Sequence, residues 1–388
     1  MNDDFTFEGW RRADGRIGIR NHCLVLATVV CAAGVVREVG RRLPEVVAVE
    51  HPHGCGRGGP DIGLQLKTLA GLVNNPNIGG TILVGLGCEP VSVGLLSSVI
   101  GQTGKPLKGI VIQEAGGSGR TAEQVEAMAR EMLAELAAMP RERGQASDLM
   151  LALECGGSDT FSGMTANPAV GKAVDHLVAM GGTAILSETT EMIGALGPLL
   201  RRAENEEVAT QLKKMVDDQE AVTRKILGDF ADRALAPGNV ESGLSTIAEK
   251  SLGCIAKGGG TPIREVLKYA QRPSKQGLVV MDTPGYDAES MTGMAAAGAQ
   301  AIAFTTGRGS PAGFPGVPVI KVSSNSEIYT RMEGDIDVDA GRVLSGMTLD
   351  DVGDEILSLL LRVCRGERTK AEVNRQDVFA IAQTHQAL

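Results

Sequence analysis

Short apolar runs alternate with amphipathic stretches along most of the chain, and this alternation predicts repeated strand–loop–helix units. In the first half, runs typical of buried strands cover residues 24–30, 46–49, 81–84 and 110–112. Helical periodicity covers residues 32–43, 65–73 and 122–139. Strands that each lead into a helix favour a parallel sheet covered by helices.

The second half repeats this pattern after a polar interruption at residues 140–147. Apolar runs predict strands at residues 149–153, 183–186, 278–281, 301–304 and 319–322, and helical periodicity covers 203–230 and 350–364. Residues 233–251 are expected to form an irregular connector. We therefore predict an α/β fold with two Rossmann-like parallel-sheet domains, residues 1–140 and 147–388, whose catalytic loops lie at the carboxyl ends of strands.

One loop, between the predicted strand at 149–153 and the helix after Pro168, is unusually rich in reactive side chains. It contains a thiol, a carboxylate, hydroxyls and an amide, at Cys155, Asp159, Ser158, Thr165 and Asn167. Asn167 is a good N-cap, and Pro168 suits the first helical turn. Ligands of open α/β sheets bind at such strand-to-helix loops. The alternatives are an ordinary turn, and a carboxylate of Asp159 that only caps that turn.

Other predicted strand ends also carry candidate groups. His51 and Cys55 follow the second strand, Cys88 and Glu89 follow the third, and residues 187–191 add Glu188 and Glu191. The loop after residue 304 contains Thr305, Thr306 and Arg308, whose planar guanidinium suits a carboxylate or sulfonate. Lys250 and Lys321 could act as bases or hold a substrate carboxylate. The alternatives without a functional role are a structural role for His51, a surface position for the glutamates, and pairing of Arg308 with a nearby aspartate.

Charge and composition exclude several classes of protein. The net charge of −9 and the absence of a Lys/Arg block argue against a nucleic-acid surface. No apolar run is long enough to span a membrane, and the acidic start is not typical of a signal peptide. Seven irregularly spaced cysteines indicate a reduced, cytoplasmic protein. Cys23, Cys31 and Cys364 lie in apolar runs and are expected to be buried, whereas Cys254 is ambiguous.

Ten motifs in order resemble the altronate/galactarate dehydratase family, which includes the large subunit of sulfolactate sulfo-lyase. They include Gly15-Arg-Ile-Gly-Ile-Arg-Asn21, His51-x-x-Gly-Cys-Gly56, Gly85-Leu-Gly-Cys-Glu89, the Cys155 loop, Ser187-Glu-Thr-Thr-Glu191 and Phe304-Thr-Thr-Gly-Arg-Gly309. Single-chain members carry a small domain before the first of these motifs, and split members carry it as a separate subunit. The chain departs from many relatives at Gly194-Ala-Leu-Gly-Pro198, where an acidic residue commonly follows the alanine.

The resemblance implies β-elimination from a 2-hydroxy acid, in which C2 loses a proton, C3 loses its leaving group and a 2-keto acid forms. It also implies Fe(II). The residues themselves offer the strand-end thiols Cys55, Cys88 and Cys155 as the expected ligands, with His51 as a further candidate, and they leave another divalent metal or an iron–sulfur cluster as alternatives. The expected catalytic residues are His51, Glu89, Asp159, Glu188, Glu191 and Lys250. The expected substrate-binding residues are Ser158, Thr165, Asn167, Thr305, Thr306, Arg308 and Lys321.

Three functions therefore compete. The first is dehydration of a sugar acid such as altronate or galactarate, and the second is release of sulfite from sulfolactate. A separate small subunit and a homo-oligomer are expected in both cases, without nucleic acid or membrane partners. The third, a nucleotide-binding dehydrogenase, requires Gly-x-Gly-x-x-Gly after the first strand, where residues 31–34 read Cys-Ala-Ala-Gly instead.

Overall fold

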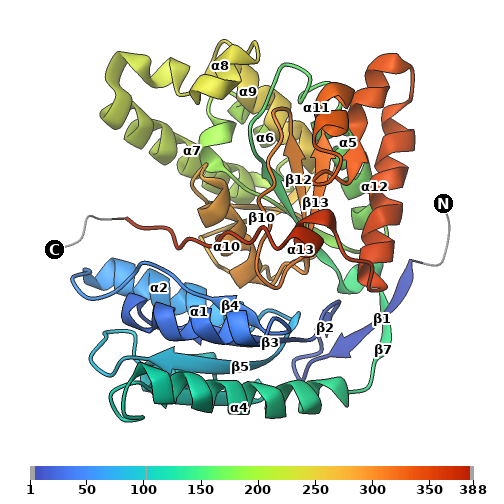
Figure 1. Cartoon of the computed structure of the whole chain (residues 1–388). Coiled ribbons are helices and arrows are strands. Elements are labelled where there is room, and N and C mark those ends of the chain that lie inside the picture. The colour runs from blue at the N-terminus through green and yellow to red at the C-terminus, as the bar shows by residue number, and fades with distance from the viewer. Residues whose placement is uncertain (1–4, 102, 385–388) are drawn as a thin grey trace.

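The computed structural model describes residues 5–101 and 103–384, which form two parallel sheets and a small antiparallel sheet (Figure 1). The first parallel sheet has four strands in the order β4-β3-β5-β6. Their bounds are β3 His22–Ala27, β4 Val47–Val49, β5 Ile78–Gly85 and β6 Leu107–Val111. Helices α1 Ala33–Arg42 and α4 Ser118–Ala137 pack on one face, and α2 Gly59–Val73 and α3 Val93–Ile100 pack on the other.

The second parallel sheet has seven strands in the order β10-β11-β9-β8-β12-β13-β14. Their bounds are β8 Met150–Cys155, β9 Thr183–Leu186, β10 Ile263–Leu267, β11 Gly277–Met281, β12 Ala301–Thr306, β13 Val319–Ser323 and β14 Val338–Asp339. Its helices are α5 Ala166–Ala179, α6 Leu196–Arg201, α7 Glu206–Leu227, α8 Pro237–Glu241, α9 Ile247–Cys254, α10 Asp287–Ala297, α11 Ser326–Arg331, α12 Leu349–Cys364 and α13 Lys370–Asn374.

Short 3₁₀ helices complete the secondary structure. They are η1 Val30–Ala32, η2 Ala146–Asp148, η3 Thr189–Met192, η4 Gly228–Arg233, η5 Ile255–Gly258 and η6 Ala340–Ser345. Two of them, η3 and η5, connect elements of the seven-stranded sheet. The α/β fold class with parallel sheets is therefore confirmed.

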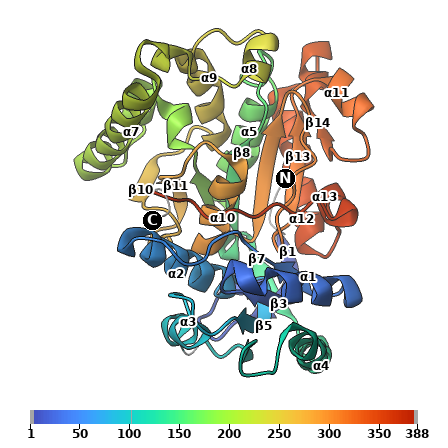
Figure 2. The same ribbon diagram turned by 60° about the vertical axis from the view of Figure 1, so that its left-hand side comes forward.

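Helices α2 and α10 lie between the two sheets and give them a shared core (Figure 1, Figure 2). A Cβ atom on Gly71 of α2 would come 2.4 Å from the Ala296 carbonyl of α10, so the two helices approach too closely for a larger side chain. The Asn75 amide, just after α2, donates to the carbonyls of Ala295 and Ala299 at 2.8 Å each. Backbone contact as well as apolar packing therefore joins the sheets.

The predicted break at residues 140–147 contains a strand. Strand β7 Glu142–Gln145 pairs antiparallel with β1 Thr6–Arg11, which also pairs with β2 Ile17–Gly18. The described start of the chain is thus fastened to the segment between the two parallel sheets. The assignment of domains to residues 1–140 and 147–388 stays a prediction.

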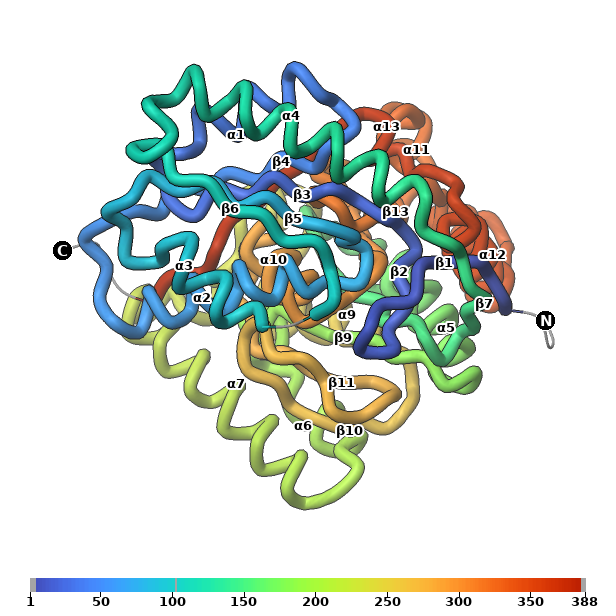
Figure 3. Tube along the Cα trace, turned by 90° about the horizontal axis from the view of Figure 1, so that it is seen from below, coloured from blue at the N-terminus to red at the C-terminus, as the bar shows by residue number. Residues whose placement is uncertain are grey.

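The C-terminal segment after α13 returns to the four-stranded sheet (Figure 1, Figure 3). Ile381 is buried, and the Gln383 amide lies 3.1 Å from Nδ1 of His53. The backbone N–H of Thr384 donates to the Asp61 carboxylate at 2.7 Å. The last described residues therefore contact the loop that follows β4.

The apolar pattern located the strands well, and the differences have local causes. Helix α2 begins six residues before the predicted stretch at 65, because Gly59 and Pro60 form its polar first turn. The short elements α3, β10 and β14 were not predicted, and the connector at 233–251 contains α8 and the start of α9. The prediction that Asn167 is an N-cap is wrong, because α5 already begins at Ala166.

Candidate active site

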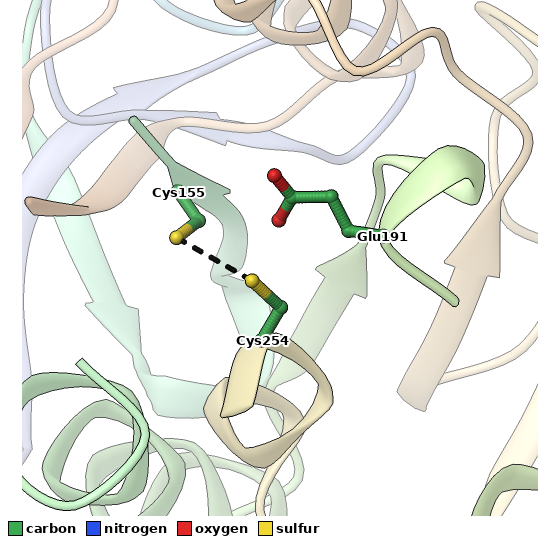
Figure 4. A group of neighbouring side chains, drawn as sticks. All are labelled: Cys155, Glu191 and Cys254. Carbon is green, nitrogen blue, oxygen red and sulfur yellow. Dashed lines mark hydrogen bonds between the residues drawn. The ribbon is translucent and has the colours of Figure 1, made fainter. Parts of the chain in front are cut away.

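The ends of β8 and α9 bring two free thiols together inside the protein. The Sγ atoms of Cys155 and Cys254 lie 3.7 Å apart, and each residue is only 2% exposed. Figure 4 shows the two side chains facing each other, with the carboxylate of Glu191 beside them. The Oγ atom of Ser158 lies 2.9 Å from the Cys155 sulfur. Two thiols, a hydroxyl and a carboxylate therefore converge at the carboxyl edge of the seven-stranded sheet.

Glu188 follows β9 in a left-handed backbone conformation, with a φ angle of 68°. Such a conformation costs a non-glycine residue ~1–3 kcal/mol and often accompanies a functional position. The Oε2 atom of Glu188 accepts from the backbone N–H of Cys155 at 3.0 Å and from Nζ of Lys257 at 2.5 Å. The Oε1 atom is buried and has no hydrogen-bond partner among the described residues. One carboxylate oxygen is thus held in place while the other is available.

Two lysines neutralise the acids of this cluster. Lys257 is fully buried on η5 and also lies 3.8 Å from Glu191. Lys250, on α9, forms an ion pair with Glu191 and keeps 14% of its side chain exposed. Because Lys250 retains the most exposed side chain among these ion-paired residues, solvent reaches the cluster from its side.

Hydrogen bonding and charge separate the pKa values of the two thiols. The hydrogen bond from Cys254, with help from Lys257 and Lys250, lowers the pKa of Cys155 to about 6 although burial opposes this. The same hydrogen bond and burial raise the pKa of Cys254. Cys155 is therefore the thiolate of the pair, and Cys254 is its thiol donor.

The pKa values of Glu188 and Glu191 are also shifted in opposite directions. Burial and the nearby charge of Glu191 raise the pKa of Glu188. Burial also acts to raise the pKa of Glu191, but Lys250 and Lys257 outweigh it and the pKa is lowered. Neighbouring acids with opposite shifts are typical of catalytic sites, because one group accepts a proton more readily than the other.

A second group of acids lies directly beside the first. Donor oxygens of Glu154, Glu188 and Asp287 lie within 4.8 Å of one another. Ser290 donates to Oε2 of Glu154 at 2.7 Å, whereas Oε1 is buried without a hydrogen-bond partner in the described part of the chain. Burial, Glu188 and Asp287 raise the pKa of Glu154. A proton that Glu188 accepts can therefore be shared with neighbouring carboxyl groups.

Cys155, Cys254 and Glu191 also fit a metal ion, because one donor atom from each lies within 4.8 Å of the others. The Oε2 atom of Glu191 is buried and lacks a hydrogen-bond partner among the described residues. Thiolates with a carboxylate suit iron or zinc better than magnesium. Lys250 and Lys257 compete for the carboxylate, so the two sulfurs would provide most of the binding.

The predicted ligand set Cys55, Cys88 and Cys155 is not brought together. Cys55 and Cys88 follow β4 and β5 of the four-stranded sheet, whereas Cys155 ends a strand of the other sheet. Figure 1 shows β5 lying across the view while β12 and β13 stand upright, so the carboxyl edges of the two sheets face different directions. The thiol beside Cys155 is that of Cys254, and not that of Cys55 or Cys88 as predicted.

His51 and Glu89 lie with Cys55 and Cys88 and apart from the Cys155 cluster. Nδ1 of His51 accepts from the backbone N–H of His53 at 3.2 Å, as expected for a structural histidine. Burial and the neighbouring His53 lower the pKa of His51 to about 4. Partial burial acts to raise the pKa of Glu89, but backbone N–H groups and Thr28 bind its carboxylate and lower the pKa. Both side chains hold loops, whereas Nε2 of His51 is buried without a hydrogen-bond partner among the described residues. The catalytic roles of His51 and Glu89 stay predictions.

Most predicted site residues of the Cys155 loop and of β12, whether catalytic or substrate-binding, have internal partners. Asp159 accepts hydrogen bonds from Ser162, Ser324 and Asn325, which is the capping alternative extended to a second loop. Thr165 donates to the Ser324 carbonyl just after β13, and Thr306 accepts from the backbone N–H of Gly309. Asn167 accepts from Thr305 of β12 and donates to the Gly253 carbonyl of α9. Of the predicted residues in the Cys155 loop, only Ser158 contacts the Cys155 sulfur directly.

Two predicted cations also have partners. Arg308 pairs with Glu241 at 3.1 Å and donates to Ser242 at 2.9 Å, with 43% of its side chain exposed. The alternative that Arg308 is a loop arginine paired with a nearby acid therefore describes its position, although the acid is a glutamate and not an aspartate. Lys321 is buried over the Phe304 ring at 4.1 Å and donates to the Ala312 carbonyl. Burial lowers the pKa of Lys321 to about 8.

Sequence reasoning missed Lys257 and Glu154 and left Cys254 undecided. Lys257 lies in a short apolar segment, and Glu154 lies at the end of an apolar run. The sequence therefore placed a charged side chain where burial was expected in both cases. A charged residue in such a place is rarely tolerated without a partner, and this was the signal that could have identified them.

Two family descriptions match the chain. "D-galactarate/Altronate dehydratase, C-terminal" matches residues 146–387, and "D-galactarate dehydratase/Altronate hydrolase, second domain" matches residues 9–137. None of the helices in the described residues has the length and apolar composition needed to cross a membrane.

Curated relatives agree with these matches. Altronate dehydratase of Bacillus subtilis is 34% identical over 98% of this chain and 78% of its own length. The (2R)-sulfolactate sulfo-lyase subunit beta of Chromohalobacter salexigens is 36% identical over 98% of both chains. Galactarate dehydratase (L-threo-forming) of Escherichia coli is 36% identical over 94% of this chain and 74% of its own length. The chain is therefore a lyase of the D-galactarate/altronate dehydratase family.

Proposed function

We propose that this chain catalyses β-elimination from a 2-hydroxy carboxylate, with dehydration of a sugar acid such as altronate or galactarate as the first candidate reaction. The observation that carries the proposal is Glu188, whose Oε2 is fixed by Lys257 and Cys155 while Oε1 has no partner in the described structure. Burial raises the pKa of this carboxyl group, which makes its carboxylate a stronger base. We assign Oε1 the proton from C2 of the substrate.

The two lysines support the developing negative charge in this proposal. Their pKa values are raised because Glu188 and Glu191 outweigh the effect of burial, so both stay protonated. Lys250, on the exposed side, would hold the substrate carboxylate, and Lys257 would keep Glu188 oriented. Preorganised cations in a site that excludes water stabilise an enediolate more strongly than water does.

A metal ion would add to this stabilisation. Cys155, Cys254 and Glu191 would hold Fe(II) or another divalent ion, which when bound acts as a Lewis acid toward the substrate oxygens. Release of sulfite from sulfolactate is the second candidate reaction, supported by the relative of that name that matches along 98% of both chains. That relative is named as a subunit, so we also propose a small companion subunit for this chain.

The test is an anaerobic assay of the purified chain with Fe(II), with and without a small companion subunit, on altronate, galactarate and sulfolactate. We expect a 2-keto acid from one of the three, and sulfite only from the last. Proton NMR in D₂O follows exchange at C2 separately, so proton abstraction is seen even when the leaving group stays. Turnover that is equal in the parent and in Glu188→Gln would refute the assignment of the base.

A further inference from the structure

The three exposed cysteines of the described chain all lie at one edge of the four-stranded sheet. Cys31 lies in η1 after β3, Cys55 follows β4, and Cys88 follows β5, whereas the other four cysteines are buried. The prediction that Cys31 is buried is therefore wrong, because β3 ends at Ala27 and the chain then turns outward. Strands β4, β3 and β5 are parallel neighbours, so their carboxyl ends meet at a single edge. Free cysteines are usually among the most buried residues, which makes three exposed thiols at one edge unusual.

Contacts between the loops hold these cysteines in a common frame. The backbone N–H of Val30, next to Cys31, donates to the His53 carbonyl at 2.7 Å. A Cβ on Gly54, next to Cys55, would lie 3.1 Å from the Val30 side chain. The third loop is tied to the first because Thr28 donates to the Glu89 carboxylate at 3.0 Å. Each of the three cysteines is thus next in sequence to a residue that contacts another of the three loops.

Three helices begin shortly after these cysteines. Helix α1 follows Cys31, α2 follows Cys55 and α3 follows Cys88, and the positive ends of helix dipoles favour bound anions. The nearest carboxylate in sequence, Glu89, already accepts hydrogen bonds from Gly87, Leu86 and Thr28. The groups presented at this edge are therefore soft sulfur donors.

We propose that Cys31, Cys55 and Cys88 bind an iron–sulfur cluster of the [4Fe–4S] type, at a site separate from the Cys155 cluster. The three thiols come from three neighbouring loops at one sheet edge, and an iron–sulfur cluster of this type takes one thiolate on each iron atom. Three thiolates leave one iron without a protein sulfur, and that iron takes an oxygen ligand from solution. Assembly from two ferrous ions, two ferric ions and about four sulfide ions requires no net electron transfer, and each cysteine releases one proton.

The test is anaerobic reconstitution of the full chain with equimolar ferrous and ferric iron and sulfide, followed by removal of unbound ions. We expect about four iron and four sulfide ions per chain, with visible sulfur-to-iron absorption. Alkylation read by mass spectrometry should show Cys31, Cys55 and Cys88 protected after reconstitution and reactive before it. These readouts do not depend on catalytic turnover, so they stand apart from the proposed lyase reaction.

Matched variants locate the cluster. The triple variant Cys31→Ser, Cys55→Ser and Cys88→Ser should lose at least fivefold in bound sulfide, and its exposed loop positions should leave the melting curve unchanged. The double variant Cys155→Ser and Cys254→Ser should retain the sulfide of the parent. Retention of sulfide by the triple variant, or a parent that binds iron or zinc without sulfide, would overturn the proposal.

Discussion

The ammonium group of Lys257 lies 2.5 Å from the carboxylate of Glu188, and neither side chain is more than 1% exposed. Removing one partner of a buried ion pair leaves an uncompensated charge, which typically costs ~3–5 kcal/mol. We expect Lys257→Met to lower the free energy of unfolding by about this amount in urea titrations. The double variant Lys257→Met and Glu188→Gln should be more stable than Lys257→Met alone. Equal stability of the single and double variants would contradict the pairing.

Replacing Glu188 tests its assignment as the base. Glu188→Gln keeps the size and the polar contacts but cannot accept a proton, so we expect kcat to fall about 10²–10⁴-fold. The matched control is Glu249→Gln, an exposed carboxylate on α9 that accepts hydrogen bonds from Ser245. The control should keep kcat within about threefold, a difference of under ~1 kcal/mol. A similar loss in both variants would point to a general effect of charge.

The structure separates two candidates for binding the substrate carboxylate. Both are paired with a glutamate, but Arg308 lies at the surface beside Glu241, whereas Lys250 lies in the buried cluster beside Glu191. We expect Lys250→Met to lower kcat/KM at least tenfold, or ~1.4 kcal/mol, and Arg308→Ala to lower it less than threefold. Steady-state kinetics on the substrate found in the lyase assay gives both values. The reverse ranking would return the role to Arg308.

The buried side chain of His51 is expected to make the protein less stable as the pH falls. Burial lowers its pKa to about 4, so between pH 6.5 and 4 the unfolded chain binds a proton that the folded chain excludes. The free energy of unfolding should therefore fall as the pH drops through this range, by up to ~3 kcal/mol. His51→Asn keeps an acceptor for the His53 N–H but cannot titrate, so its stability should depend less on pH. Parallel pH profiles of parent and variant would exclude His51 as the cause.

The apolar pattern alone predicted most of the strands and therefore the residues at strand ends. Cys155, Glu188 and Glu191 were placed correctly at the edge of a parallel sheet, because their positions depend on local periodicity. The pattern could not predict how the two sheet edges are oriented relative to each other. That orientation depends on the packing of α2 against α10, which is a contact between residues far apart in sequence.

The partners of the site were harder to predict than its position. Cys254 and Lys257 reach the cluster from α9 and η5, elements that connect the α7 region to β10. Arg308 was a convincing anion site in sequence because it is flanked by glycines, but α8 supplies it with Glu241 and Ser242. Helices that fold back over a sheet edge leave no periodic signal of where they will dock, so such contacts require the structure.

The position of α10 has a consequence for synthesis of the protein. Helix α10 follows α2 by more than two hundred residues, yet it covers the apolar face of α2. At ~5–20 residues per second, a ribosome needs about 10–40 s to make the intervening chain. During that interval the four-stranded sheet and its helices can form while the outer apolar face of α2 remains uncovered in water. The nascent chain is therefore most exposed to aggregation, and most dependent on chaperones, between the emergence of α2 and that of α10.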